Sequence, residues 1–287
     1  MQKLIIIAGA TATGKTEKAI QLAKQINGEI ISADSMQVYK YLNIGTAKPT
    51  LQEREEIEHH LMDIIDPFAS FSVHEYQQLA LKSINLIHKK GKTPILVGGT
   101  GFYINAVLYK QSFNENESPK VREYYTHLAE NQSKEYMHDL LMTLDHVAAK
   151  NIDINNTKRV VRALSFIKGT GKLFSDYKLS QEPAFDAKII LLECERNELY
   201  KKINTRVDTM LKKGLINEVK SLMDMGLNIS CQSMQGIGYK EVYKYLTGEA
   251  ELDETIDKIK QNTRNYAKRQ ITWFKHKLPK NNIISLL

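Results

Sequence analysis

A glycine-rich segment near the start of the chain has the residue types and the spacing that bind phosphate groups. Residues 9–16 fit the phosphate-loop pattern G-x-x-x-x-G-K-[ST] in full. In such a loop the glycines let consecutive backbone N–H groups turn inward, the following helix adds positive potential, and Lys15 reaches the outer phosphate. Thr16 would supply a hydroxyl to Mg²⁺. We therefore expect a diphosphate or longer polyphosphate to bind at Gly9, Ala10, Thr11, Ala12, Thr13, Gly14, Lys15 and Thr16.

The segments on either side of this loop have the expected character. Leu4–Ala8 is an apolar run that predicts a buried strand, and Thr16–Ala23 has helical composition. Because phosphate loops lie between a strand and a helix, this context favours phosphate binding over a glycine-rich turn with an incidental lysine. The reaction at the bound phosphates stays open at this point.

Two further segments are expected at the same edge of a sheet, because ligands of open α/β sheets bind at the carboxyl ends of the strands. Asp34 follows the short strand Glu29–Ser32, and Gly98–Gly101 follows the strand Thr93–Val97. Asp34 is predicted to be a general base or a Mg²⁺ ligand, with a helix N-cap as the alternative. Gly98–Gly101 lacks the Asp that holds Mg²⁺ in nucleotide-hydrolysing proteins, and we expect it to allow close approach of a substrate.

Cations gather in two other regions. Asn262–Lys275 mixes cations and aromatic residues along one predicted helix, which fits nucleic-acid binding and equally fits a solvated helix with one apolar face. Arg206 is predicted either to reach a phosphate or to pair with Asp208. A further basic cluster consists of Lys158, Arg159 and Arg162.

Composition limits the class of protein. The chain has 287 residues, 42% of them hydrophobic, and can bury a full core. Its net charge of +7 permits a nucleic-acid partner. No apolar run approaches the ~20 residues that span a bilayer, and the distant Cys194 and Cys231 are predicted to be reduced thiols. We therefore expect a cytoplasmic protein without membrane association or obligatory protein partner, and a monomer.

The order of the predicted elements gives the fold class. Strand and helix signals alternate over the first hundred residues, and Ser72–Glu75 reads as the capping box of a helix. A polar run at Asn114–Pro119 then leads into a helical region. The strand Ala187–Leu192 follows, and only helices are predicted after it, including Leu252–Lys277.

These signals predict an α/β fold with a P-loop NTPase-like parallel sheet core, a helical insertion domain and a helical C-terminal region. The expected divisions are the first part of the core at 1–114, a helical insertion at 115–183, and the completion of the core with basic helices at 184–287.

With these residues assembled, the chain resembles the bacterial tRNA dimethylallyltransferases, the tRNA isopentenyltransferases that modify adenosine 37 beside the anticodon. The resemblance covers almost the whole length of the chain. A lone phosphate loop occurs in proteins of many functions, but this ordered set of motifs is specific to the family. Ala10 departs from the family, which more usually has proline there. The other similar segments, in order, are Asp34–Tyr39, Asn43–Pro49, Leu96–Gly101, Gly236–Tyr239 and Ala267–Phe274.

The resemblance implies transfer of a dimethylallyl group from dimethylallyl diphosphate to N6 of adenosine 37, with Mg²⁺ as cofactor and diphosphate as leaving group. Lys15, Thr16 and Arg206 would hold the diphosphate, and Asp34 would accept the proton of the attacking amine. The adenine would flip out of its stack to reach this depth. The implied catalytic residues are Lys15, Thr16, Asp34, Thr100 and Arg206.

The resemblance also implies contacts with the anticodon stem-loop of the tRNA. Thr100 and Arg122 correspond to family positions near the flipped base. The expected tRNA-binding residues are Asp34, Ser35, Met36, Gln37, Thr100, Arg122, Lys158, Arg159, Val160, Val161, Arg162, Gln235, Gly236, Ile237, Gly238, Tyr239, Lys240, Lys268 and Arg269.

Three alternatives share parts of this pattern. A nucleoside or small-molecule kinase would place ATP in the loop and a hydroxyl acceptor at Asp34, although the basic C-terminal helix weighs against it. An adenylate isopentenyltransferase would use the same donor with less need of the Lys158–Arg162 cluster. A nucleotide-switched RNA-binding protein lacks support because the chain has no Asn-Lys-x-Asp signal for guanine.

Overall fold

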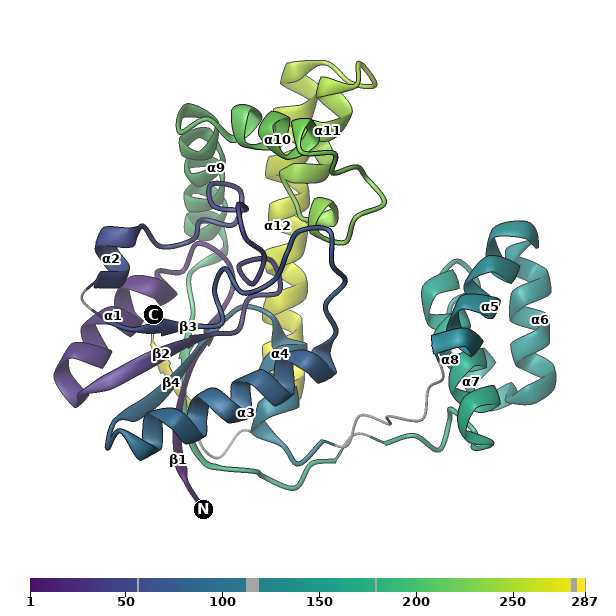
Figure 1. The fold of residues 1–287 in the computed structure, drawn as a ribbon, viewed down its shortest axis with the longest axis horizontal. Coiled ribbons are helices and arrows are strands. Elements are labelled where there is room, and N and C mark those ends of the chain that lie inside the picture. Colours follow the sequence, from purple (N-terminus) through teal and green to yellow (C-terminus); the bar gives the residue numbers. More distant parts are fainter. Residues whose placement is uncertain (56, 112–118, 179, 280–282, 287) are drawn as a thin grey trace. The chain divides into compact units, whose positions relative to one another are not determined.

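A computed structural model of the chain describes residues 1–55, 57–111, 119–178, 180–279 and 283–286 (Figure 1). Its internal contacts divide it into two compact units, residues 1–110 with 182–287, and residues 111–181. The expected boundary at 114/115 lies outside the described residues. The expected boundary at 183/184 stays a prediction, two residues beyond the change of unit after residue 181.

Unit 1 is built on a six-stranded sheet of order β3-β2-β4-β1-β5-β6, and every described strand pair is parallel. The central strand β1 pairs on both sides, so that Ile5 lies opposite Ile95 in β4 and opposite Lys188 in β5. This confirms the predicted parallel α/β sheet. The strands are β1 (Lys3–Gly9), β2 (Gly28–Ser32), β3 (His59–His60), β4 (Thr93–Gly98), β5 (Asp186–Leu192) and β6 (Ile283–Leu286).

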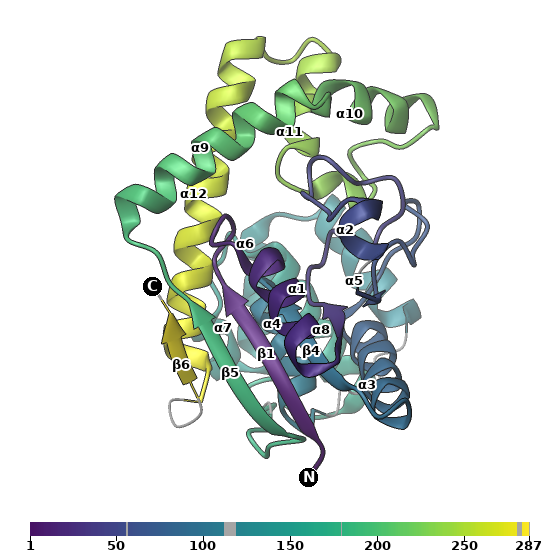
Figure 2. The same ribbon diagram turned by 90° about the vertical axis from the view of Figure 1, so that its left-hand side faces the viewer.

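Two edge strands were not expected from the sequence. β3 has only two residues, too few for an alternating pattern to show. β6 adds a parallel strand beside β5 at the C-terminal end of the chain (Figure 2), so the expectation that only helices follow β5 is wrong. Its four residues are a short apolar run, which does not indicate a strand until a sheet edge is available to pair with it.

The helices of unit 1 cover both faces of this sheet. The predicted capping box is present, because Ser72 N donates to Glu75 Oε2 at 2.8 Å and Glu75 N donates to Ser72 Oγ at 3.2 Å. The long helix has the predicted bounds. The helices are α1 (Lys15–Ile26), α2 (Leu51–Glu55), α3 (Val73–Lys89), α4 (Gly101–Leu108), α9 (Arg196–Lys212), α10 (Leu215–Asp224), α11 (Tyr239–Leu246) and α12 (Leu252–Lys277).

Successive residues of the central strands enter two different clusters of the core. Ile6 packs in the larger cluster with Tyr76 of α3, whereas Ile7 packs in a second cluster with Ala19 and Ala23 of α1. Neighbouring strand residues point to opposite faces, so both faces of the sheet are buried. This explains why the strands read as continuous apolar runs.

Unit 2 is helical, as predicted for the insertion, and has a core of its own. Met137, Leu141 and Leu164 are fully or almost fully buried in it. Asp145 is buried and accepts hydrogen bonds from the backbone N–H groups of Ala148 at 2.9 Å and of Ser175 at 2.8 Å. Its helices are α5 (Pro119–Asn131), α6 (Lys134–Leu144), α7 (His146–Asn151) and α8 (Thr157–Thr170). Across the described parts of both units, each helix is too short or too polar to cross a membrane.

Candidate active site

The phosphate loop ends at the first turn of α1. Gly14 has φ +82°, a left-handed conformation that glycine adopts without strain, and α1 begins at the next residue. Lys15 Nζ donates to the carbonyl oxygen of Ala10 at 2.6 Å, and Thr13 Oγ1 donates to the same oxygen at 2.8 Å. Among the described residues no side chain caps the N-terminus of α1. Its first backbone N–H groups are thus available to an anion, and binding of a diphosphate there stays a prediction.

A glutamine of α12, which the sequence did not single out, holds this loop from the side. Gln270 is buried, and its Oε1 accepts a hydrogen bond from Thr11 N at 2.9 Å. Its Nε2 donates to the carbonyl oxygen of Gly99 at 2.9 Å. Gln270 therefore connects the phosphate loop to the end of β4. The sequence signal that could have identified Gln270 is that it is a neutral amide on the predicted apolar face of a basic helix.

Asp34 lies directly after β2 and does not cap a helix. Its Oδ1 accepts hydrogen bonds from Met36 N at 2.9 Å and from Gln37 N at 3.4 Å, which is an Asx turn. The next helix along the chain is α2, so the N-cap alternative is wrong. The turn holds one carboxylate oxygen at the end of the strand, and Asp34 lines a cavity there.

Thr100 contacts the same segment from the neighbouring strand end. Its Oγ1 accepts from Ser35 N at 3.1 Å, and it is also hydrogen-bonded to the hydroxyl of Tyr266 in α12. Burial and the nearby Asp34 carboxylate raise the pKa of Tyr266 to about 12, although its hydrogen bonds oppose the shift. The phenol therefore stays protonated at neutral pH and can donate a hydrogen bond. Three elements thus meet at Asp34.

Two cations face this carboxylate. Loss of hydration and the positive charge of Arg206 lower the pKa of Lys15 to about 8, while the Asp34 carboxylate acts in the opposite direction. Burial also lowers the pKa of Arg206, again opposed by Asp34. The alternative that Arg206 pairs with Asp208 is not seen, because Asp208 Oδ1 lies 2.7 Å from Lys260 Nζ. Lys15, Arg206 and Asp34 therefore form one electrostatic group.

Two cavities flank this group. The first, of about 290 Å³, is lined by Asp34, Tyr239, Tyr266 and Arg269 among others. The second, of about 1070 Å³, extends beside the phosphate loop and is rich in lysines. Arg206 and Met210 line both cavities. The two cavities are therefore adjacent. The smaller one contains the Asp34 carboxylate, and the larger one is lined by several lysines.

The glycines at the end of β4 and just beyond it are needed for packing within the protein itself. A Cβ on Gly98 would lie 2.1 Å from the carbonyl oxygen of Ala33, and one on Gly99 would lie 2.2 Å from Gln270 Nε2. A Cβ on Gly101 would lie 2.4 Å from the Trp273 ring. These glycines are therefore not space for a substrate. They let the end of β2, at Ala33, and helix α12 pack closely against the end of β4.

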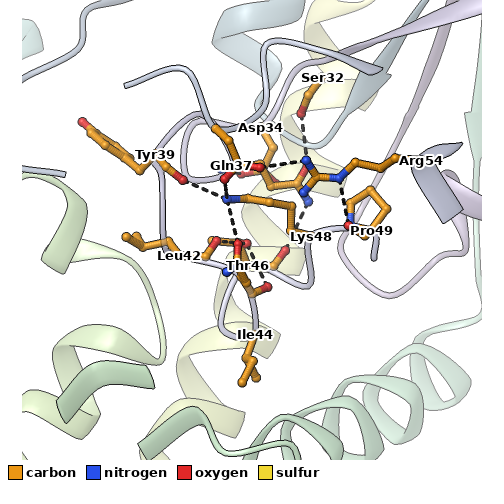
Figure 3. A network of polar contacts seen from close by, with 12 residues as sticks. Ser32, Asp34, Gln37, Tyr39, Leu42, Ile44, Thr46, Lys48, Pro49 and Arg54 are labelled. Atoms are coloured by element: carbon orange, nitrogen blue, oxygen red, sulfur yellow. Dashed lines mark hydrogen bonds and ion pairs between the residues drawn. The ribbon is translucent and has the colours of Figure 1, made fainter. Parts of the chain in front are cut away.

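The segment between Asp34 and α2 is fixed by a buried lysine. Lys48 Nζ donates to the carbonyl oxygen of Tyr39 at 2.8 Å (Figure 3). It also donates to Asp63 Oδ1 at 2.6 Å. Gln37 adds a second bridge, because its Oε1 accepts from Ser32 Oγ at 3.1 Å and its Nε2 donates to the carbonyl oxygen of Thr46 at 3.2 Å. These bonds give a long irregular segment one conformation.

The remaining sequence-predicted residues fall into three places. In unit 1, Gln235, Gly236, Ile237 and Tyr239 line the cavity of Asp34, and so do Ser35 and Met36. Lys240 and Lys268 are exposed. In unit 2, Arg122, Lys158 and Arg159 are exposed and Arg162 is partly exposed.

The structure corrects two residues of the predicted tRNA-binding segment. Val160 is 1% exposed and Val161 is 8% exposed, and both belong to the core of unit 2. Their side chains are not available to an RNA ligand. These valines lie between Arg159 and Arg162 in the sequence because they form part of the apolar face of α8.

The family model described as IPP transferase matches residues 37–277. The chain is 46% identical over 279 residues to a tRNA dimethylallyltransferase of Caldanaerobacter subterraneus subsp. tengcongensis, covering 95% of this chain and 89% of the relative.

The chain belongs to the IPP transferase family.

Solved structures of similar proteins agree. The tRNA delta(2)-isopentenylpyrophosphate transferase of Staphylococcus epidermidis is 44% identical, with TM-score 0.73 and coverage of 99% of this chain and 93% of that chain. The full-length tRNA isopentenylpyrophosphate transferase of Bacillus halodurans is 44% identical, with TM-score 0.74 and coverage of 100% and 90%. A eukaryotic dimethylallyltransferase acting on tRNA is 34% identical, with TM-score 0.86 and coverage of 100% and 74%.

Oxygen donors suitable for Mg²⁺ lie beside the phosphate loop of this IPP transferase. Thr16, Asp34 and Gln37 line one small cavity of about 40 Å³ with Lys15. Hydroxyl, carboxylate and amide oxygens are hard ligands of the kind Mg²⁺ takes, so these residues fit the predicted ion.

A second acidic group in the described part of the chain has a different character. Glu29, Glu58 and His60 lie close enough together to share a metal ion. However, Lys90 and Lys92 contact Glu29 at 3.0 and 2.8 Å. Burial alone would raise the pKa of Glu29, but hydrogen bonds from Lys92, His60 and Lys90 outweigh it and lower the pKa to about 2. This group is an ion-pair cluster around a buried carboxylate.

The pKa of Lys15 predicts a pH dependence of anion binding. Its pKa is lowered to about 8, so the ammonium form predominates below that pH and is lost as the pH rises through it. We expect the affinity for an alkyl diphosphate to fall between about pH 7.5 and pH 9. Calorimetric titration over this range measures the change. The Lys15→Arg variant, which stays charged, should bind with a flatter profile, and an equal fall in that variant would assign the effect to another group.

Proposed function

We propose that this chain transfers a dimethylallyl group from dimethylallyl diphosphate to tRNA and releases diphosphate. The observation that carries the proposal is that Lys15 and Arg206 lie in the same electrostatic group as the Asp34 carboxylate. A leaving diphosphate needs cations, and an attacking amine needs a proton acceptor. Family membership and the 46% identity to a tRNA dimethylallyltransferase support this reaction.

The reaction follows from the charges of the site. The exocyclic N6 of an adenine attacks C1 of the dimethylallyl group, and the bond from C1 to the ester oxygen of the diphosphate breaks. The electron pair of that bond leaves with the diphosphate, whose increased charge Lys15 and Arg206 stabilise. Asp34 takes the proton that the amine loses. The backbone N–H groups at the start of α1 hold the diphosphate in place.

Tyr266 and Thr100 orient the Asp34 carboxylate, the proton acceptor. Thr100 holds the backbone of Ser35, the residue after Asp34, and Tyr266 is hydrogen-bonded to Thr100. Mg²⁺, held by Thr16 with Asp34 or Gln37, would supply further positive charge to the diphosphate. The lysine-rich cavity beside the loop is the space from which a polyanionic donor would enter.

We further propose that the acceptor is adenosine 37 in the anticodon stem-loop. Such a base must flip out of its stack to reach a carboxylate at a strand end. The cavity of about 290 Å³ that contains Asp34 also contains Arg269 and Tyr266, a cation and an aromatic ring suited to a phosphate and a base. The solved structure of a relative acting on tRNA supports this class of acceptor.

Three parallel reactions test the proposal against the kinase and the adenylate-modifying alternatives. The protein is incubated with bulk tRNA and prenyl-labelled donor, with tRNA and γ-labelled ATP, and with AMP and the labelled donor. Transfer of the prenyl label to tRNA alone is expected. Transfer of γ-phosphate would identify a kinase, and equal prenylation of AMP and tRNA would identify an adenylate isopentenyltransferase.

Binding of tRNA should weaken steeply with salt, because the exposed cations of unit 2 are expected to contact phosphates. Replacing Lys158, Arg159 and Arg162 by Gln should reduce the log–log slope by somewhat under one unit per residue. The Michaelis constant for tRNA should rise and that for the donor should not. Filter binding between 50 and 300 mM salt measures the slope.

The matched control neutralises three other exposed lysines of unit 2, Lys150, Lys168 and Lys172. If this control reduces the slope by the same amount, net charge and not a defined patch is responsible. If the slope is independent of Lys158, Arg159 and Arg162, these residues are outside the tRNA interface.

A further inference from the structure

One carboxylate holds a loop whose residues line both larger cavities described above, the one that contains Asp34 and the lysine-rich one. Glu218, in α10, accepts hydrogen bonds from three consecutive backbone N–H groups. Asn43 N donates to Oε2 at 3.1 Å, Ile44 N donates to Oε2 at 2.8 Å, and Gly45 N donates to Oε1 at 3.1 Å. Consecutive N–H groups that turn inward form a concavity typical of anion sites. Here the anion is a side chain of the protein.

A tyrosine at the start of α11 joins the same carboxylate. Tyr239 is buried, and its hydroxyl donates to Glu218 Oε1 at 2.6 Å. Its ring lies against Gly45 so closely that a Cβ there would lie 2.5 Å from a ring carbon. Glu218, Tyr239 and Gly45 thus form a tightly packed junction between α10, α11 and the loop.

The residues of this loop face two different spaces. Asn43, Ile44 and Lys48 line the large lysine-rich cavity, whereas Gly45 and Thr46 line the cavity of Asp34. A shift of the loop would therefore change a wall of both cavities together. Lys48 fixes the returning end of the loop, and Glu218 fixes its tip.

We propose that Glu218 is a positioning residue that sets the geometry of both substrate cavities through residues 43–46. The proposal rests on the proposed function, in which the donor enters by the large cavity and the acceptor base by the smaller one. Glu218 lines neither cavity and acts through the loop and Tyr239.

The Glu218→Gln variant tests this role without a change of size. A carboxylate accepts at both oxygens, but a carboxamide accepts at one and presents an NH₂ group at the other. In either orientation that NH₂ faces backbone N–H groups, at Asn43 and Ile44 or at Ile44 and Gly45. The loop tip must therefore move. Because misplacement by 1 Å can cost about 100-fold, we expect a fall of about 10-fold in kcat/KM for a smaller shift.

The expected result is a lower single-turnover rate and higher Michaelis constants for donor and tRNA, with an unchanged fraction of active sites. Tyr239→Phe removes a hydroxyl that donates to Glu218 and accepts from the backbone N–H groups of Gly45 and Thr46. It leaves the carboxylate in place and should have a smaller effect. The double variant should be no worse than Glu218→Gln alone, because both changes act on one junction. Asp145→Asn is the matched control, since Asp145 is a buried carboxylate that accepts from two backbone N–H groups of unit 2. It should leave the donor constants unchanged.

Three results would overturn the proposal: unchanged constants in a folded Glu218→Gln, a loss proportional only to unfolded protein, or full additivity with Tyr239→Phe. Thermal unfolding and active-site titration separate folding from positioning. The parent protein is measured in the same assays. If it transfers no prenyl group to tRNA, the proposed function fails, and if only the variant data disagree, the role of Glu218 fails.

Discussion

Replacing Asp34 by Asn should reduce the single-turnover rate of prenyl transfer by about 10²–10⁴ while tRNA affinity changes little. The amide keeps an oxygen that can accept from Met36 N, so the turn after β2 is retained. It cannot take the proton of the attacking amine. Rapid-quench measurements with saturating donor and tRNA isolate the chemical step, and filter binding gives the affinity.

Asp66 offers a matched control for this substitution. Its Oδ1 accepts a hydrogen bond from Phe68 N at 2.9 Å, the same local turn that Asp34 makes with Met36, but it is exposed. Asp66→Asn should leave the rate unchanged. A wild-type rate in Asp34→Asn would mean that Asp34 only stabilises the turn after β2 and that another group accepts the proton.

Replacing Lys15 by Ala should weaken donor binding and also lower kcat, by about 10²–10³. In the proposed reaction this cation contacts the group whose charge grows as the bond breaks, so it should stabilise the transition state more than the bound substrate. Lys15 also donates to the carbonyl oxygen of Ala10, which adds a loss of order in the loop. Single-turnover rates over a range of donor concentrations separate binding from chemistry.

Two comparisons sharpen this result. Lys15→Met keeps the length of the side chain without its charge, and it should be as impaired as Lys15→Ala. Recovery of activity in the Met variant would assign the role to packing. Lys18 is exposed one turn further along α1, and Lys18→Ala should behave as the parent protein. Inorganic pyrophosphate should compete with the donor in the parent and poorly in Lys15→Ala.

Sequence patterns predicted the parts of the fold that have local causes. The phosphate loop between an apolar strand and a helix, the capping box at Ser72 and the bounds of α12 all depend on residues near one another in the chain. These patterns reflect glycine conformation, helix capping and side-chain periodicity, which act over a few residues. The predicted parallel sheet followed from their order.

The contacts that complete the site join segments far apart in the chain, and no local sequence pattern predicts them. Gln270 reaches Thr11, and Glu218 reaches the backbone of residues 43–45. The glycines at 98 and 101 suggest space for a ligand, because a glycine run in the sequence does not tell which neighbour approaches; in the structure Ala33 and Trp273 fill that space. β6 was missed for the same reason, since its partner β5 precedes it by some 90 residues.

The contact between Thr11 and Gln270 has a consequence for synthesis on the ribosome. The two residues are 259 positions apart, so the phosphate loop leaves the ribosome long before its acceptor exists. At about 5–20 residues per second, the interval is roughly 10–50 s. During that time Thr11 N lacks its Gln270 acceptor, and Asp34 lacks the tyrosine that is hydrogen-bonded to Thr100. A nascent or prematurely terminated chain therefore carries the predicted phosphate loop without the helix that holds it in its final geometry.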